Sequence, residues 1–141
     1  MDYIKPDTLE DALAAASGGN AEYIGGGTHR GRGVRYSPEI LISLENLGLG
    51  GITENEKEWV IGSGVCFQDL CDFPGLPPAI AKAAEYTASR TLRNMKTVGG
   101  EVAEKSSRSC LLAVLAAMDA VVGFAETGSA VSLADYLIGS E

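Results

Sequence analysis

Residues 92–100 of this 141-residue chain read Leu92-Arg93-Asn94-Met95-Lys96-Thr97-Val98-Gly99-Gly100. The stretch ends on a glycine pair, and three cationic side chains stand just before that pair, those of Arg90, Arg93 and Lys96. Glycine lets the backbone approach a ligand closely and present its N–H groups to it. Arginine and lysine add charge-assisted hydrogen bonds to phosphates. The stretch therefore predicts a turn that accepts an anionic group.

A second glycine-rich turn, Gly25-Gly26-Gly27-Thr28, lies most of a domain's length upstream. It follows the strand-like run Glu22-Tyr23-Ile24 and leads into the cationic segment His29-Arg30-Gly31-Arg32-Gly33. Either turn alone is a weak signal, because glycine pairs are common wherever a strand ends. Together they predict one dinucleotide site. A Rossmann fold is set aside, because Tyr36 stands where the third glycine of G-x-G-x-x-G should be.

Composition predicts one globular domain, since 45% of the residues are hydrophobic and 141 residues suffice for a core. The formal net charge of −8 argues against binding to nucleic acids or to anionic membranes, both of which need a basic face. A local phosphate site is still compatible with this charge, because salt screens distant carboxylates over about 8 Å.

The three cysteines, Cys66, Cys71 and Cys110, form no C-x-x-C pair and are odd in number. Neither a disulfide framework nor a zinc site is indicated, and we expect all three thiols to be buried. No signal peptide is evident at the start, so the sequence predicts a cytoplasmic protein. The most apolar run, residues 110–125, is too short for a membrane span and contains Asp119.

The first 50 residues predict a small α/β unit. Asp7 is the expected cap of a helix, with Glu10 completing a capping box, and residues 17–20 end that helix. A strand then enters the first glycine turn, and residues 40–44 predict a buried strand.

Residues 51–141 predict a larger second subdomain. Trp59 and Tyr86 are expected in its core or at an interface. The expected elements, in chain order, are a hairpin within 52–62, a helix at 79–88, a strand at 101–103, an apolar helix at 110–118, a hairpin within 121–132 and a closing helix at 133–138.

This order of elements resembles the FAD-binding domain of the molybdenum hydroxylases, the family of xanthine dehydrogenase and carbon monoxide dehydrogenase, over essentially the whole chain. Residues 92–100 are close to that family's motif R-N-x-x-T-[IV]-G-G, and residues 25–28 are similar to its A-G-G-T loop. The resemblance implies an α+β fold with a small α/β subdomain (1–50) and a larger α+β subdomain (51–141), and without the C-terminal domain of larger relatives. FAD would lie between the two subdomains.

The resemblance also implies a function and its partners. The chain would be the FAD-binding electron-transfer subunit of a multi-subunit molybdopterin-dependent oxidoreductase. It would pass electrons between iron–sulfur clusters and NAD or another acceptor. A molybdopterin-binding large subunit and a 2Fe–2S small subunit would be its partners, and substrate would bind on the former.

The two glycine segments and their neighbours supply the predicted FAD-binding residues. Glu101 stands where the family has asparagine and would place a carboxylate beside the diphosphate, and Cys110 aligns with a flavin-contacting aspartate. Arg93 is equally a phosphate ligand or a partner of a carboxylate or carbonyl, and His29 is a candidate phosphate contact. No catalytic side chain and no metal ligand is predicted. The predicted set is Ile24, Gly25, Gly26, Gly27, Thr28, His29, Arg30, Thr87, Arg93, Thr97, Val98, Gly99, Gly100, Glu101 and Cys110.

Two other functions stay open on the sequence. A flavin-free scaffold subunit with a degenerate site would explain Glu101, Cys110 and the missing C-terminal domain. A general nucleotide-binding module is weaker, because no Walker lysine follows a glycine loop. Bulky residues at Gly26 and Gly99 are expected to abolish flavin binding and to leave the fold intact.

Overall fold

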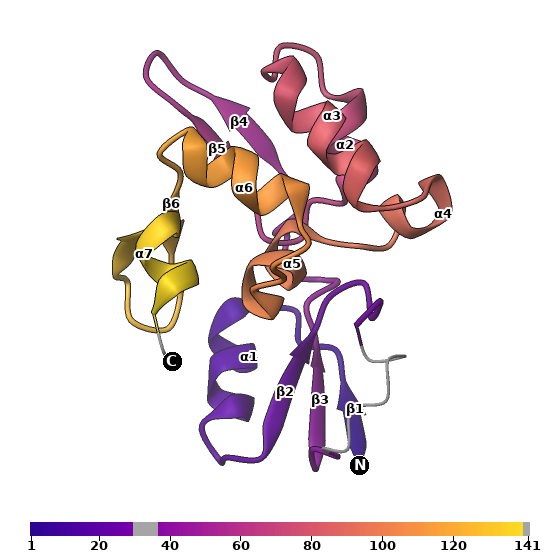
Figure 1. Cartoon of the computed structure of the whole chain (residues 1–141). Coiled ribbons are helices and arrows are strands. Elements are labelled where there is room, and N and C mark those ends of the chain that lie inside the picture. The colour runs from indigo at the N-terminus through magenta and orange to yellow at the C-terminus, as the bar shows by residue number, and fades with distance from the viewer. Residues whose placement is uncertain (30–36, 140–141) are drawn as a thin grey trace.

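The computed structural model describes residues 1–29 and 37–139 (Figure 1). At one end lies a small unit of three strands and one helix, and the larger, mostly helical remainder lies against the upper edge of its sheet. The fold is mixed α+β, as predicted from the sequence. Within the described residues, no helix is both long and apolar enough to cross a membrane.

The small unit contains β1 (Asp2–Ile4), α1 (Leu9–Ala16), β2 (Ala21–Ile24) and β3 (Ile40–Ser43). Its strands are parallel in the order β1-β3-β2, and α1 packs on them. The middle strand β3 is almost wholly buried, which explains its unbroken apolar sequence. The carboxyl ends of parallel strands lie at the same edge of a sheet. At this edge the chain leaves β2 and directly enters the first glycine segment, residues 25–28.

Helix α1 begins one residue later than the sequence suggested. Thr8 is its cap: the Thr8 hydroxyl oxygen accepts from the Asp11 N–H at 3.1 Å and the hydroxyl donates to the Asp11 carboxylate at 2.7 Å. Asp7 instead accepts a hydrogen bond from the Asn46 side chain at 3.0 Å. The predicted cap at Asp7 with Glu10 is therefore wrong, because Thr8 holds the extended backbone of the cap position.

The larger part begins with an antiparallel hairpin, and a second one precedes its closing helix, as predicted. In chain order its elements are β4 (Ile52–Glu54), β5 (Trp59–Ile61), α2 (Phe67–Asp72), α3 (Pro78–Thr87), α4 (Arg90–Arg93), α5 (Val98–Glu104), α6 (Cys110–Ala117), β6 (Val121–Gly123), β7 (Ala130–Ser132) and α7 (Leu133–Ile138). Three of its helices, α3, α6 and α7, lie close to their expected positions, and α4 adds a single turn in the cationic stretch.

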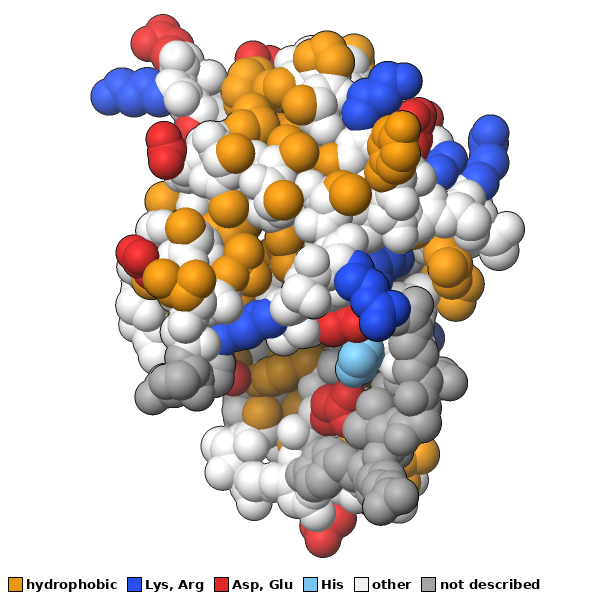
Figure 2. Space-filling view, in the orientation of Figure 1, with side chains coloured by type: hydrophobic (Ala, Val, Ile, Leu, Met, Phe, Trp, Pro, Cys, Tyr) orange, Lys and Arg blue, Asp and Glu red, His pale blue; other side chains and the backbone are white. Residues whose placement is uncertain are grey.

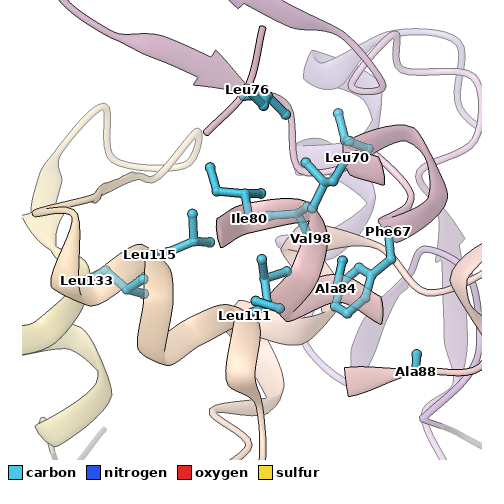
Figure 3. Close-up of a cluster of buried hydrophobic side chains, with 12 residues drawn as sticks. Phe67, Leu70, Leu76, Ile80, Ala84, Ala88, Val98, Leu111, Leu115 and Leu133 are labelled. Carbon is cyan, nitrogen blue, oxygen red and sulfur yellow. The ribbon is translucent and has the colours of Figure 1, made fainter. Parts of the chain in front are cut away.

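The core of the larger part lies where α2, α3 and α6 meet (Figure 3). Phe67, Ile80 and Leu111 are buried there, and Leu133 of α7 closes one side. Tyr86 is not a core residue, because 84% of it is exposed. It lies about 200° around α3 from the buried Ala84, on the opposite face of the helix.

Residues 101–103 do not form the predicted strand, because they belong to α5. Thr97 caps this helix: its side-chain oxygen accepts from the Gly100 N–H at 3.1 Å. Glycine is a poor helix former, so the two glycines in the first turn conceal the helix in the sequence. The second glycine segment is therefore the start of a helix, and α5 lies over the carboxyl edge of the parallel sheet (Figure 1).

Candidate cofactor-binding site

A cavity of about 460 Å³ opens between the carboxyl end of β2 and the face of α5. In the space-filling view the molecule is hollowed where the small unit meets the larger part, and acidic, basic and histidine side chains lie around the hollow (Figure 2). Both glycine segments contribute to the lining, so two stretches about 70 residues apart in sequence form one site. Its described lining is Ala21, Glu22, Tyr23, Ile24, Gly25, Gly26, Gly27, Thr28, His29, Lys96, Thr97, Gly100, Ala103 and Glu104.

The first glycine segment brings unused hydrogen-bond donors to this cavity. The sheet ladder stops where the Leu44 N–H donates to the Ile24 carbonyl at 3.0 Å. Beyond that point, the backbone N–H groups of residues 25–28 have no acceptor within the part of the chain that is described. Gly27 has φ +69°, a left-handed conformation that turns the chain at low cost only in glycine. Four neighbouring free amides are a suitable site for phosphate oxygens.

The glycines here also allow two parts of the backbone to touch. A Cβ atom on Gly26 would lie 1.4 Å from the Met95 carbonyl oxygen, and one on Gly25 would lie 2.9 Å from Thr97 Oγ1. The segment before α5 is therefore seated directly on the first glycine segment. This contact fixes the distance between the two sides of the cavity.

In the second glycine segment, the backbone N–H groups of residues 98–101 are already paired. The N–H groups of Val98 and Gly99 donate to the carbonyls of Val65 (2.9 Å) and Ser63 (2.8 Å). Those of Gly100 and Glu101 donate to Thr97, at 3.1 and 3.0 Å. The prediction of bare N–H groups thus agrees with the first segment within the described residues, and it is wrong for residues 98–101 of the second, whose amides are taken up by the helix cap and by packing.

Gly99 is required by packing against Ser63, a residue distant in the sequence. A Cβ atom there would lie 2.6 Å from Ser63 Cβ and 2.8 Å from the Ser63 carbonyl oxygen. Together with the contact at Gly26, this means that bulky residues at either position would disturb the fold itself. The expectation that such variants leave the fold intact is therefore wrong.

The carboxylate of Glu101 is buried and does not line the cavity. Only 1% of Glu101 is exposed, and its Oε2 lies 2.5 Å from Nζ of Lys96. Among the described residues, no donor forms a hydrogen bond of acceptable geometry with this oxygen. The positive charge of Lys96 therefore compensates the buried negative charge of the carboxylate. The predicted clash between Glu101 and a diphosphate does not arise in this arrangement.

Two further side chains, those of Glu104 and His29, lie next to this pair on the cavity side. Glu104 lies one helical turn beyond Glu101, with its carboxylate 3.6 Å from Nζ of Lys96. His29 Nδ1 lies 3.0 Å from the other carboxylate oxygen of Glu104. These contacts link the end of the first glycine segment to α5.

Eight of the predicted residues line the cavity, and six described ones do not. Val98, Gly99 and Glu101 lie in α5 with the roles given above. Cys110 is the first residue of α6, outside the cavity. Arg30 lies outside the described residues. The eight that line it are Ile24, Gly25, Gly26, Gly27, Thr28, His29, Thr97 and Gly100.

Thr87 and Arg93 are engaged elsewhere. The Thr87 hydroxyl donates to the Ala83 carbonyl at 2.8 Å and accepts from the Leu111 N–H at 3.3 Å, which ties α3 to α6. The Arg93 guanidinium donates to the Gln68 side chain at 3.1 Å and to the Ala88 carbonyl at 3.0 Å. In this structure both residues hold helices together.

The prediction did not include Lys96, Ala103 and Glu104, which also line the cavity. Ala103 and Glu104 stand three and four residues after Gly100, the spacing of one helix face. Reading residues 98–104 as a helix would have placed both beside Gly100.

The expected burial of all three cysteines is wrong for Cys110, which is exposed on the same face of α6 as Ala113 and Ala117. Cys66 and Cys71 are partly buried, and burial raises the pKa of both thiols. A raised pKa leaves less of the reactive thiolate at a given pH.

We therefore expect iodoacetamide to modify Cys110 before the other two cysteines, as measured by mass spectrometry. Cys110→Ser should remove the fast phase, and equal rates at all three thiols would contradict this placement.

Comparison with known proteins identifies the family of this chain. All of residues 1–141 match the model of the FAD binding domain in molybdopterin dehydrogenase. The chain is 33% identical over 138 residues to the uncharacterized protein YgfM of Escherichia coli (strain K12), which covers 96% of this chain and 53% of that protein. It is 28% identical over 131 residues to subunit alpha of the 6-hydroxypseudooxynicotine dehydrogenase complex of Paenarthrobacter nicotinovorans, covering 86% and 44%.

Solved structures show the same fold. CO dehydrogenase from Oligotropha carboxidovorans aligns with a TM-score of 0.86 at 26% identity, over 96% of this chain and 51% of that one. Quinoline 2-oxidoreductase from Pseudomonas putida 86 aligns with a TM-score of 0.87 at 22% identity, over the same shares, 96% and 51%. The chain spans about half the length of the curated relatives it matches. Since the family model matches its whole length, the chain belongs to the family of FAD-binding domains of molybdopterin dehydrogenases.

Proposed function

We propose that this chain is the FAD-binding electron-transfer part of a multi-subunit molybdenum-dependent oxidoreductase. The observation that carries the proposal is the row of amides at residues 25–28, which have no acceptor among the described residues and belong to a segment that lines a cavity at the end of a parallel strand. FAD contains a diphosphate, and neighbouring backbone N–H groups are suitable hydrogen-bond donors to its oxygens. Bound FAD supplies the redox chemistry, taking up electrons from one centre and releasing them to another.

The residues of the chain bind and orient the cofactor. The free amides of residues 25–28 donate to the diphosphate, and the missing side chains of Gly25 and Gly26 let the other wall approach. Thr97 supports this arrangement twice, by capping α5 and by contacting Gly25. The division into subdomains 1–50 and 51–141 belongs to the same proposal, with the cofactor between them.

The proposed partners are a molybdopterin-binding large subunit and a 2Fe–2S small subunit, with NAD or another molecule as electron acceptor and the cytoplasm as location. One support is that the Paenarthrobacter relative is named as a subunit of a dehydrogenase complex. The family match to molybdopterin dehydrogenases is the other. Substrate would bind on the large subunit, so no substrate is assigned to this chain.

A visible absorbance spectrum of the purified chain, followed by titration with FAD, tests the proposal. We expect saturable uptake of FAD with the absorbance bands of a bound flavin. If no FAD is taken up, either by the chain alone or with partner subunits added, the flavin-free scaffold becomes the better interpretation. Recovery of those subunits without flavin in a pull-down would agree with that alternative.

A further inference from the structure

Lys96 occupies a fixed place beside the first glycine segment. Its neighbours in the chain, Met95 and Thr97, are the two residues that press against Gly26 and Gly25. The Lys96 side chain lines the same cavity as the free amides of residues 25–28. Of the described residues that line this cavity, Lys96 is the only lysine or arginine.

Burial and charge keep the Lys96 ammonium group at the cavity wall. Its side chain is 14% exposed, and its charge is balanced by the almost fully buried carboxylate of Glu101 at 2.5 Å. The Glu104 carboxylate lies farther away at 3.6 Å, on the cavity side, and also contacts His29. Phe67 lies beneath, with its ring centre 5.8 Å from Nζ. Lys96 and Glu101 thus form a largely buried pair with no net charge, and Lys96 is the member of the pair that lines the cavity.

We propose that the Lys96 ammonium donates a hydrogen bond to the diphosphate of FAD, and that Glu101 is the buried counterion that holds it there. The inference rests on the proposed function. An ammonium carries three N–H donors, so one can serve Glu101 while another serves a phosphate oxygen. The longer contact with Glu104 is the one that an entering phosphate replaces. The cofactor site thereby combines the neutral amides of the first glycine segment with one charged donor from the second.

A double substitution separates this hydrogen bond from the general effect of charge. The variant K96M/E101Q removes the ammonium and its counterion together, so the net charge beside the cavity stays the same. We expect its dissociation constants for FAD and ADP to rise about 10- to 100-fold, the loss of a hydrogen bond to a charged group. Binding of riboflavin, which has no phosphate, should not change. The readout is fluorescence or calorimetric titration of the full chain.

The control is a second lysine–glutamate pair with a similar N–O distance, which lies exposed on the surface. Lys5 Nζ lies 2.6 Å from the Glu45 carboxylate, and neither residue lines the cavity. The variant K5M/E45Q should bind FAD, ADP and riboflavin as the unmodified chain does. A loss of FAD affinity in both double variants would assign the effect to the fold and overturn the inference.

The remaining outcomes separate the inference from the proposed function. If the unmodified chain takes up FAD and K96M/E101Q binds FAD and ADP as tightly as the unmodified chain does, Lys96 is not a ligand. In that case the inference is wrong and the proposed function stands. If the unmodified chain takes up no FAD with its partners, the proposed function fails. Circular dichroism checks folding, and K96M/E101L, which replaces the pair by two apolar side chains, carries the same prediction.

Discussion

Gly26→Ala should weaken FAD binding by about 100-fold or more, the loss of two or more hydrogen bonds to a charged acceptor. The added methyl group would lie 1.4 Å from the Met95 carbonyl oxygen, a distance that no pair of unbonded atoms adopts. Both partners are backbone atoms, so neither side moves aside by a change of rotamer. The first glycine segment would have to separate from the segment before α5, and its free amides would lose their alignment with the opposite wall.

The same substitution should lower the free energy of unfolding by about 1–3 kcal/mol or more, because overpacking between two backbone segments is costly. Denaturant unfolding measures this loss and FAD titration measures the loss of affinity. Gly18→Ala is the matched control, since a Cβ atom at Gly18 meets nothing within 4 Å. Unchanged affinity and stability in Gly26→Ala would show that the close contact does not form in solution.

Lys96→Met alone should destabilise the chain by about 3–5 kcal/mol, because it leaves the buried carboxylate of Glu101 without a compensating charge. Glu101 is only 1% exposed, and Glu104, the nearest other charged group of the cluster, is also an acid. Among the described residues, Oε2 of Glu101 accepts no hydrogen bond that could replace its contact with Lys96. The loss is a large share of the stability of an ordinary domain.

Urea unfolding of three variants tests this prediction without any cofactor. Lys96→Met should unfold at much lower urea concentration than the unmodified chain, and K96M/E101Q should recover most of the difference. Glu101→Gln alone should cost less than Lys96→Met, because Lys96 keeps Glu104 as a partner. If Lys96→Met is as stable as the double variant, Glu101 is not held as a buried charge.

Several elements could be predicted from sequence because local signals and packing agree there. Residues 40–43 form an apolar run between turn residues, and they are the central buried strand. The hairpin at 52–61 has its acidic tip where the chain turns, and the closing helix covers Leu133–Ile138 as expected. The sequence predicts that the two glycine segments lie together, and in the structure residues of both line one cavity.

The remainder depends on contacts between distant residues. Helix α5 contains two glycines in its first turn and is stabilised by the Thr97 cap and by packing on Ser63. Neither contribution produces the periodic pattern of apolar residues by which a helix is predicted from sequence. Without that helix, the sequence placed Glu101 beside the ligand and gave no position to Glu104. Lys96 and Glu101 are five residues apart, and only the capped turn between them brings their charges together.

The internal bonding of α5 changes what the T-V-G-G motif can tell about a relative. The amides of its first turn are paired with Thr97, Ser63 and Val65, and Gly99 is required by the close approach of Ser63. A protein that had abandoned its flavin would still need this motif in order to fold. Cofactor retention in a relative is therefore better judged by whether the amides after β2 stay open and whether a donor stands at the position of Lys96.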